Sequence, residues 1–274
     1  MRYVAIGLVC ILGLILAVPL VMMFSGSLIP IEENIGAPNR VFPRNPTLEN
    51  FGKLRGWPIG LWFFNSSFTA LMKVGGAMVV TTMAAFGISK FQFRGRSVVM
   101  ATIVVSFVFS GFGTTMPKYL VCRSLGLFDS YAALIVPSLG SAMWVWFLVK
   151  FMRSIPNDLI AMGRLDGLGP FGLLRHVILP MSAPPLAGLA GLAIVGSWQG
   201  YLWPLIITRS KYLTVLPVGI REVVWLDQLV RLDKGNPGIT LAGAVIVTIP
   251  GIILFLVSQR YLVNGLFAKS TGGE

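Results

Sequence analysis

The chain has 274 residues, of which 55% are hydrophobic and only 12% are charged. A soluble domain carries about 25% charged residues, so the composition excludes an ordinary soluble protein and indicates a protein that crosses a membrane several times. The net charge of +12 suits an anionic lipid surface, partner or cargo. Nucleic acid is not expected as a partner, because the basic residues are scattered between apolar runs and form no stripe.

Six apolar runs, each of about 20 residues or more as a bilayer core requires, follow one another along the chain. They cover residues 3–24, 59–88, 98–117, 131–151, 182–207 and 239–258. A signal peptide is the alternative for the first run, because Arg2 precedes it, but the run is long for one and no small-x-small site closes it. We therefore predict an all-α integral membrane protein, a single domain over residues 1–274 with six transmembrane helices.

An even number of spans places both termini on one side of the membrane. Residues 89–97 and 153–180 lie on that side, and residues 25–58, 118–130 and 208–238 lie on the other. The side of the termini holds ten Lys and Arg, if Lys150 at the end of the fourth run is included, with three acidic residues, for a net +7. The other side holds eleven with seven, for a net +4. Basic residues are denser in the shorter segments, which favours the side of the termini as cytoplasmic.

A hydrophilic segment at residues 153–180, named the knuckle below, separates the fourth and fifth apolar runs. Pro156 suits the first turn of a helix, where its missing N–H costs nothing, and Asp158 in that turn complements the helix dipole. Asp166 and Gly167 then end the helix, and the Gly-Pro pair that follows starts a second one. We predict two short helices round a sharp turn that present a rigid surface to a partner protein; a structured loop without a partner is the alternative.

Both helices of the knuckle are predicted to be amphipathic. Leu159, Met162 and Leu165 recur at i, i+3 and i+6 and give the first helix one apolar face. The second helix carries a similar apolar spacing up to Val177 and is expected to end at Pro180.

At these residues the chain resembles the permease subunits of bacterial ABC importers, whose cytoplasmic loop carries the pattern P-x-[ED]-L-x-E-A-A-x-x-D-G-A and then a run that ends in L-P. The matching residues are Pro156, Asp158, Leu159, Asp166, Gly167, Leu179 and Pro180. Ala161, Met162 and Gly163 stand where Glu-Ala-Ala is usual. The resemblance is strongest to the second permease of maltose-type carbohydrate importers, and it extends to residues 65–66, 84–86, 93–96, 125–130, 201–204 and 259–266.

This resemblance implies the type I ABC importer permease fold in a bacterial inner (cytoplasmic) membrane, with cytoplasmic termini. The implied partners are a homologous second permease, two ATPase subunits and an external solute-binding protein that delivers sugars or oligosaccharides. ATP and Mg would be bound by the ATPase subunits, so the chain is expected to be a transport subunit without a cofactor. The residues implied in coupling to the ATPases are Pro156, Asp158, Leu159, Ala161, Gly163, Asp166, Gly167 and Pro180.

The residues themselves offer no catalytic or metal site. His176 is the only histidine, no G-x-x-x-x-G-K-[ST] loop is present to hold ATP, and the predicted spans contain no Asp or Glu. The missing carboxylates argue against a proton-coupled secondary transporter or a channel, and the missing His and acidic clusters argue against a membrane-embedded enzyme. Cys10 and Cys122 fall at different depths, so we expect no disulfide between them.

Lys73 lies near the middle of the second predicted span, where an ionisable side chain is a candidate for the transport pathway. Gly75 and Gly76 beside it permit close helix approach. The alternative is that the lysine snorkels or faces a backbone carbonyl. A neutral sugar is the expected cargo, and an anionic saccharide, such as a uronate oligomer or a sugar phosphate, is the second possibility because Lys73 and the net +4 of the external segments would attract it.

Two further segments are candidates for contact with cargo or with a partner. Trp198, Gln199 and Tyr201 lie in the fifth run and can stack on sugar rings or bond to hydroxyls, although an interfacial aromatic belt is the alternative and accounts for Trp203. Relatives often carry Trp-Asn-Glu where this chain has Trp-Gln-Gly. In the segment 208–238, the resemblance implies that Trp225, Leu226 and Asp227 contact the binding protein, against the alternative of a solvated loop.

Overall fold

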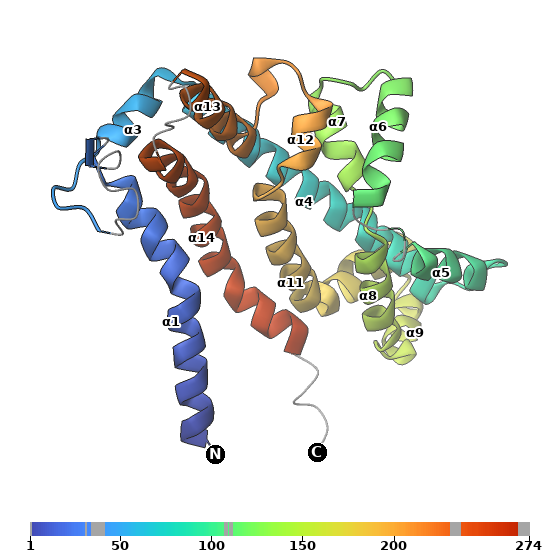
Figure 1. Ribbon diagram of the computed structural model, residues 1–274. Helices are drawn as coiled ribbons and strands as arrows, with labels where there is room; N and C mark the ends of the chain where they lie inside the picture. The colour runs from blue at the N-terminus through green and yellow to red at the C-terminus, as the bar shows by residue number, and fades with distance from the viewer. Residues whose placement is uncertain are drawn as a thin grey trace. The chain divides into compact units, whose positions relative to one another are not determined.

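The structure is a computed structural model that describes residues 2–30, 32–33, 42–106, 109, 112–230 and 237–267. These residues form helices and no strand, which confirms the predicted all-α class (Figure 1). The α-helices are α1 (Arg2–Ser27), α3 (Glu49–Lys53), α4 (Ile59–Lys90), α5 (Arg96–Val105), α6 (Thr115–Ser124), α7 (Tyr131–Ile135), α8 (Ala142–Arg153), α9 (Asn157–Leu165), α10 (Pro170–Leu173), α11 (Leu179–Trp198), α12 (Leu202–Ile207), α13 (Leu216–Val230) and α14 (Pro237–Phe267). A π-helical stretch, Leu174–Ile178, joins α10 to α11.

Four helical segments of the described chain are long and apolar enough to cross a membrane. They are Tyr3–Ser27, Ile59–Lys90, Pro170–Trp198 and Pro237–Tyr261. A fifth span results if the pair Tyr131–Ser138 and Ala142–Arg153, bent by 43°, is taken as one crossing. These segments match the first, second, fifth, sixth and fourth predicted spans, so four or five of the six predicted spans have such a helix among the described residues.

The third predicted span, residues 98–117, is the one that these helices do not supply. Helix α5 has 10 residues, which at 1.5 Å per residue gives about 15 Å, half of a bilayer core. The next helix, α6, begins at Thr115, and residues 107, 108, 110 and 111 between them lie outside the described part of the chain.

The chain divides into two units, which we describe separately. The smaller unit comprises residues 1–64 and 214–252. Its α1 exposes most of its apolar side chains, as expected for a helix that lipid covers. The buried Asn50 side chain ties α3 to the end of α1 by donating to the carbonyls of Ser27 and Ile29, each at 2.9 Å.

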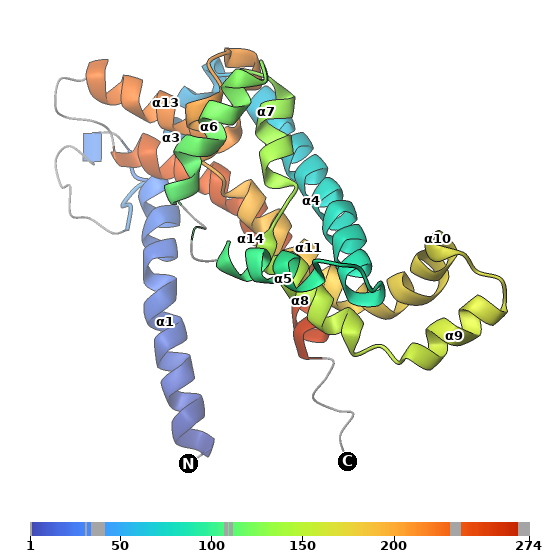
Figure 2. The same cartoon turned by 90° about the vertical axis from the view of Figure 1, so that its right-hand side faces the viewer.

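The larger unit comprises residues 65–213 and 253–274. In it α8 packs against both α5 and α11. Helices α6, α7 and α12 gather at one end of the unit, and the knuckle helices α9 and α10 project from the opposite end (Figure 2). A hydrophobic cluster between the knuckle, α4, α8 and α11 forms the core at that end.

Two of the predicted external loops are substantially helical. Helix α6 takes up the first half of the segment 118–130, and α13 takes up 15 residues of the segment 208–238. In α13, Leu216, Ile220 and Val223 recur at i, i+4 and i+7 and are all buried, the spacing of an amphipathic helix. The sequence prediction missed these helices because it searched for membrane-length apolar runs and read the charged residues between them as loop.

Candidate coupling surface and membrane cavity

The turn of the knuckle has the geometry that the sequence predicts. Asp166 follows the last residue of α9, and Gly167 has φ +80°, in the left-handed region that favours glycine. The Gly167 and Leu168 amides donate to the carbonyls of Arg164 and Gly163 at 3.0 and 2.9 Å, which satisfies carbonyls at the helix end. Pro170 opens α10 as predicted, whereas Pro156 caps α9 one residue before the helix begins.

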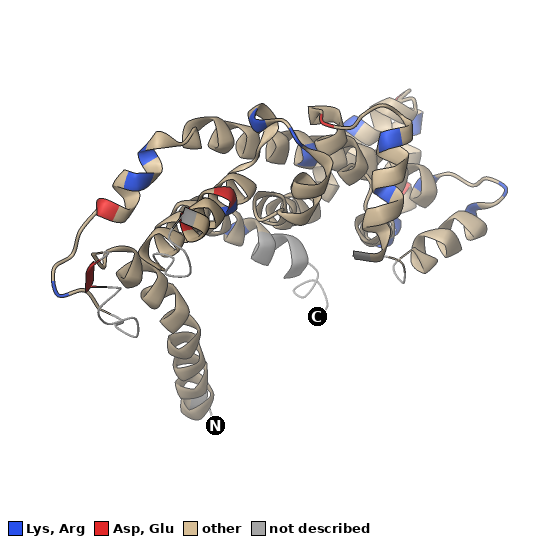
Figure 3. Ribbon diagram, turned by 45° about the horizontal axis from the view of Figure 1, so that its top comes forward, with Lys and Arg blue, Asp and Glu red and all other residues tan. Residues whose placement is uncertain are grey.

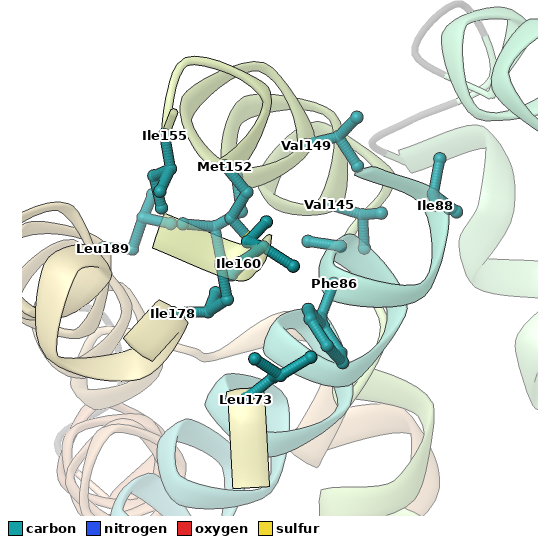
Figure 4. Close-up of a cluster of buried hydrophobic side chains, with 12 residues drawn as sticks. Phe86, Ile88, Val145, Val149, Met152, Ile155, Ile160, Leu173, Ile178 and Leu189 are labelled. Carbon is teal, nitrogen blue, oxygen red and sulfur yellow. The ribbon is translucent and has the colours of Figure 1, made fainter. Parts of the chain in front are cut away.

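The buried face of α9 is formed by Ile160 and Gly163. Ile160 is 7% exposed and Gly163 is also buried. Ile160 lies among the side chains of Met152, Leu173 and Ile178 (Figure 4). A Cβ at Gly163 would come within 2.7 Å of a Leu173 methyl group, so this glycine lets the two knuckle helices approach closely.

The predicted apolar face points outward instead. Leu159, Met162 and Leu165 are all exposed, Met162 by 60% and Leu165 by 88%, and Phe171 on α10 is 72% exposed. Exposed contiguous apolar side chains mark a surface that another protein covers. We name these four residues the outer face of the knuckle. The spacing predicted one apolar face on α9, and Leu159, Met162 and Leu165 do share a face. The side of α9 that packs inward is the one that carries Ile160 and Gly163.

Lys90 fastens the knuckle to the end of α4. Its Nζ donates to the carbonyl of Ile155 at 2.9 Å and lies 3.5 Å from Asn157 Oδ1. A lysine at the last position of a helix also complements the helix dipole. Sequence analysis missed this contact because the two residues are 65 positions apart; the only signal was a basic residue at the end of an apolar run.

The second knuckle helix does not end at Pro180. The helical segment Pro170–Trp198 runs through 29 residues, and Pro180 lies in the first turn of α11, directly after the π-helical stretch. The regular hydrogen-bond ladder is already interrupted in such a stretch, so a proline there does not stop the helix. His176 in this stretch is exposed, with Nδ1 3.1 Å from the carbonyl of Gly172.

A cavity of about 300 Å³ lies within the larger unit, beside the middle of α4. Its walls come from α4, the bend before α8, α8 itself, α11 and α12. The lining residues are Lys73, Val74, Ala77, Ser138, Trp144, Leu192, Ala193, Gly196, Ser197, Gly200, Trp203 and Pro204. Lys73 is thus a cavity-lining residue. The adjacent Gly76 packs against Leu139 so closely that a Cβ would lie 2.5 Å from a leucine methyl group.

The other pathway candidates do not line this cavity. Trp198 is buried at the end of α11, Gln199 follows it as the C-cap, and Tyr201 precedes α12. Trp203, which the sequence assigned to an aromatic belt, lines the cavity and donates from its indole Nε1 to the carbonyl of Ala133 at 3.0 Å. Trp144 was missed, because it belongs to no motif and only the fold brings it near Lys73. Ser197 lies in the candidate stretch 196–204, but it was not singled out there.

The end of the larger unit that carries α7 and α12 is held by long-range hydrogen bonds. Asn65 is fully buried; its amide donates to the Tyr212 carbonyl and its Oδ1 accepts from the Tyr131 hydroxyl, each at 2.7 Å. Asp129 accepts from the amides of Arg209 and Ser210 at 2.8 and 2.9 Å. These contacts fix the segments that border the cavity.

The residues expected to meet a binding protein lie on helix α13 and not in a loop. Trp225 is 53% exposed, Leu226 is exposed, and Asp227 is half-buried. The Arg221 guanidinium lies 5.9 Å from the centre of the Trp225 ring. The helix therefore offers apolar and basic groups together.

Both cysteines are free thiols. Cys10 is exposed on α1, and Cys122 is 4% exposed in α6. Burial raises the pKa of the Cys122 thiol above its ordinary value, because the thiolate is disfavoured away from water.

A helical membrane protein with a two-helix knuckle over a buried core has the architecture of an importer permease. The family model for the binding-protein-dependent transport system inner membrane component matches residues 78–267, so the chain belongs to that family. The resemblance to ABC importer permeases that the knuckle suggested is thereby confirmed.

Individual relatives agree along nearly the whole chain. The arabinooligosaccharides transport system permease protein AraQ of Bacillus subtilis (strain 168) is 28% identical over 266 residues, 96% of this chain and 92% of the relative. The sn-glycerol-3-phosphate transport system permease protein UgpE of Brucella suis biovar 1 (strain 1330) is 29% identical over 269 residues, 94% of each chain. A crystal structure of a bacterial ABC transporter involved in the import of the acidic polysaccharide alginate matches with a TM-score of 0.82 and 22% identity over 95% of each chain, which shows the same fold.

Proposed function

We propose that the chain is the membrane permease of an ATP-driven importer of sugars or oligosaccharides and forms half of the translocation pathway. The observation that carries the proposal is the outer face of the knuckle, four exposed apolar side chains fixed over a buried core. The family membership and the names of the relatives, which include an arabinooligosaccharide permease, support the sugar cargo. A homologous second permease supplies the other half.

Two ATPase subunits dock on the outer face and bind the ATP and Mg, so this chain is a transport subunit and not an enzyme by itself. ATP binding closes the ATPases and displaces the knuckle. The rigid anchoring of the knuckle by Ile160, Leu173 and Lys90 then makes the membrane helices move with it. Hydrolysis resets the cycle, which alternates access to the pathway between the two sides.

The solute-binding protein meets the opposite side of the membrane. Trp225, Leu226 and Asp227 on α13 are the proposed contact, since exposed aromatic and apolar groups with a neighbouring arginine are enriched at protein interfaces. In this arrangement the chain spans the bacterial inner membrane several times, with the knuckle and both termini in the cytoplasm.

Replacing Leu165 by Asp tests the docking role of the outer face. Leu165 is 88% exposed, so the substitution should leave the fold intact but remove most of the ATPase subunits that co-purify with the chain and most ATP-driven uptake. Leu125→Asp is the matched control, because Leu125 is 66% exposed on the proposed external side and should keep the ATPases bound. Normal ATPase binding by the Leu165 variant would contradict the proposal.

ATP depletion provides a second test of the mechanism. Uptake into intact cells should stop when ATP is depleted and should continue when the proton gradient alone is collapsed. The reverse pattern would favour a secondary transporter and would remove the knuckle from the energy coupling.

A further inference from the structure

We propose that the cavity beside α4 is a subsite for the anionic group of an acidic saccharide, with Lys73 as its cationic ligand. The inference rests on the proposed function, since it takes the cavity to be part of the cargo pathway, and it adds the chemical class of the cargo. The site would recognise negatively charged oxygen atoms, which both a uronate carboxylate and a sugar phosphate carry.

The first support is that Lys73 has no counter-ion among the residues that the structure describes. Within the described residues, its amine makes no ion pair or hydrogen bond, although α4 places it inside a membrane-crossing helix. An ammonium group in such a place is costly unless it is paired. The helix therefore holds a cation whose partner must come from outside the described residues of this unit.

The acidic residues in the described part of the larger unit do not provide that partner. Between residues 65 and 213 there are only Asp129, Asp158 and Asp166, and red segments are correspondingly sparse among the blue ones in Figure 3. Asp129 is already bonded to two backbone amides at the end of the unit near α7 and α12. The other two lie in the knuckle, at the opposite end.

The second support is the polar atom that shares the cavity with Lys73. Ser197 on α11 lines the same cavity, and its Oγ is buried without a hydrogen-bond partner among the described residues. A buried hydroxyl without a partner is destabilising, so a ligand that bonds to it supplies a contact that the described residues lack. Ser138 adds a second hydroxyl at the rim.

The third support is the volume of the cavity and the two tryptophan rings in its lining. A volume of about 300 Å³ lies at the small end of ligand pockets, about 300–1,000 Å³. Trp144 and Trp203 contribute indole rings, and the Trp203 ring is fixed by its bond to Ala133. One cation, two hydroxyls and two indoles fit a single sugar unit that carries one negative group.

The experiment uses the whole importer, purified through a tag on this chain and reconstituted in proteoliposomes with ATP inside. Initial uptake is measured for three probes: a trigalacturonate, a hexose phosphate and the neutral galactotriose. The variants are Lys73→Met, which removes the charge, and Lys73→Arg, which keeps it. Lys150→Met is the matched control, because this exposed lysine lies against Trp146 and does not line the cavity.

We expect the ratio of anionic to neutral uptake to fall about tenfold or more in Lys73→Met, and to change less than about threefold in Lys73→Arg and Lys150→Met. If uptake of the trigalacturonate falls in Lys73→Met, the subsite recognises a carboxylate. If uptake of the hexose phosphate falls, the subsite recognises a phosphate. Two outcomes would overturn the subsite alone. One is an unchanged ratio in Lys73→Met, whether or not the second permease is lost from the purified complex. The other is an equal loss in Lys73→Arg. If the unmodified complex hydrolyses ATP but imports none of the probes, the proposed function fails and the subsite with it.

Discussion

The knuckle and the cavity are built in opposite ways. The turn of the knuckle is a local structure: the end of α9, a glycine in the left-handed region and the start of α10 follow one another within residues 153–180. The cavity is assembled from helices that are far apart in sequence, with Lys73 on α4 and Ser197 on α11. The turn therefore depends on neighbouring residues, whereas the cavity depends on the long-range contacts that position its walls. The knuckle as a whole is still anchored by Lys90 and by the core that it shares with α4, α8 and α11.

The largest expected effect comes from Gly167→Val. The φ of +80° costs a residue with a Cβ about 1–2 kcal/mol, more for a β-branched one, so the turn should change shape. We expect the sugar transported per ATP hydrolysed to fall at least about tenfold while the chain still inserts and ATP is still hydrolysed. Flux and hydrolysis measured on the same proteoliposomes give this ratio.

The matched control for this variant is Gly169→Val in the same turn. Neither glycine would bring a new Cβ within 4 Å of another group, but Gly169 has an ordinary φ of −69°. Its substitution should therefore leave coupling unchanged. Equal losses in the two variants would show that bulk and not backbone conformation matters there.

Asn65→Ala should have the next largest effect. The substitution leaves the Tyr212 carbonyl and the Tyr131 hydroxyl without their partner, which costs about 1–3 kcal/mol of the free energy of unfolding. Unfolding in mixed micelles measures this loss.

Asn157→Ala in the knuckle is the comparison, because Asn157 is exposed and its contact with Lys90 is 3.5 Å long. This substitution should lower the free energy of unfolding by less than about 0.5 kcal/mol. Similar costs would contradict the difference between the two regions.

The same difference explains what the sequence could and could not predict. The turn at Gly167, the start of α10 and the apolar periodicity of α9 depend on neighbouring residues, so they were predicted correctly. The inward side of α9, the bond from Lys90 and the walls around Lys73 depend on distant segments, so they could not be derived from spacing. Lys73 itself was found because a charge in a membrane span is visible in the sequence alone; Ser197 and Trp144 offered no such signal.

Thiol labelling tests the proposed topology, in which the knuckle is cytoplasmic and α6 is external. A cysteine at His176, which is exposed, should react with an impermeant maleimide only after the cells are opened. Native Cys122 should stay unlabelled in intact cells, because it is 4% exposed and its pKa is raised, so both access and thiolate are limited. Ser124→Cys in a Cys122→Ala background should react from outside, since Ser124 is exposed in the same helix. Labelling at position 176 in intact cells would invert the topology.

Ala161→Glu should have the smallest effect. It restores the residue usual in relatives at an exposed position of α9, where an acidic side chain can be solvated without loss of packing. We expect uptake within about twofold of the unmodified importer, since surface substitutions change stability by about 0.5 kcal/mol or less. A large gain in uptake would show that coupling in this chain is limited by the missing carboxylate.

The unbroken helical segment from Pro170 to Trp198 has a thermodynamic consequence. One end of it carries the exposed ring of Phe171 and the other carries Ser197 in the cavity wall, so two ligands act on a single covalent element. If that element has two positions, each ligand biases the same equilibrium, and linkage requires the effects to be reciprocal. The factor by which docked ATPases change the affinity for a saccharide in the cavity must then equal the factor by which that saccharide changes the affinity for the ATPases.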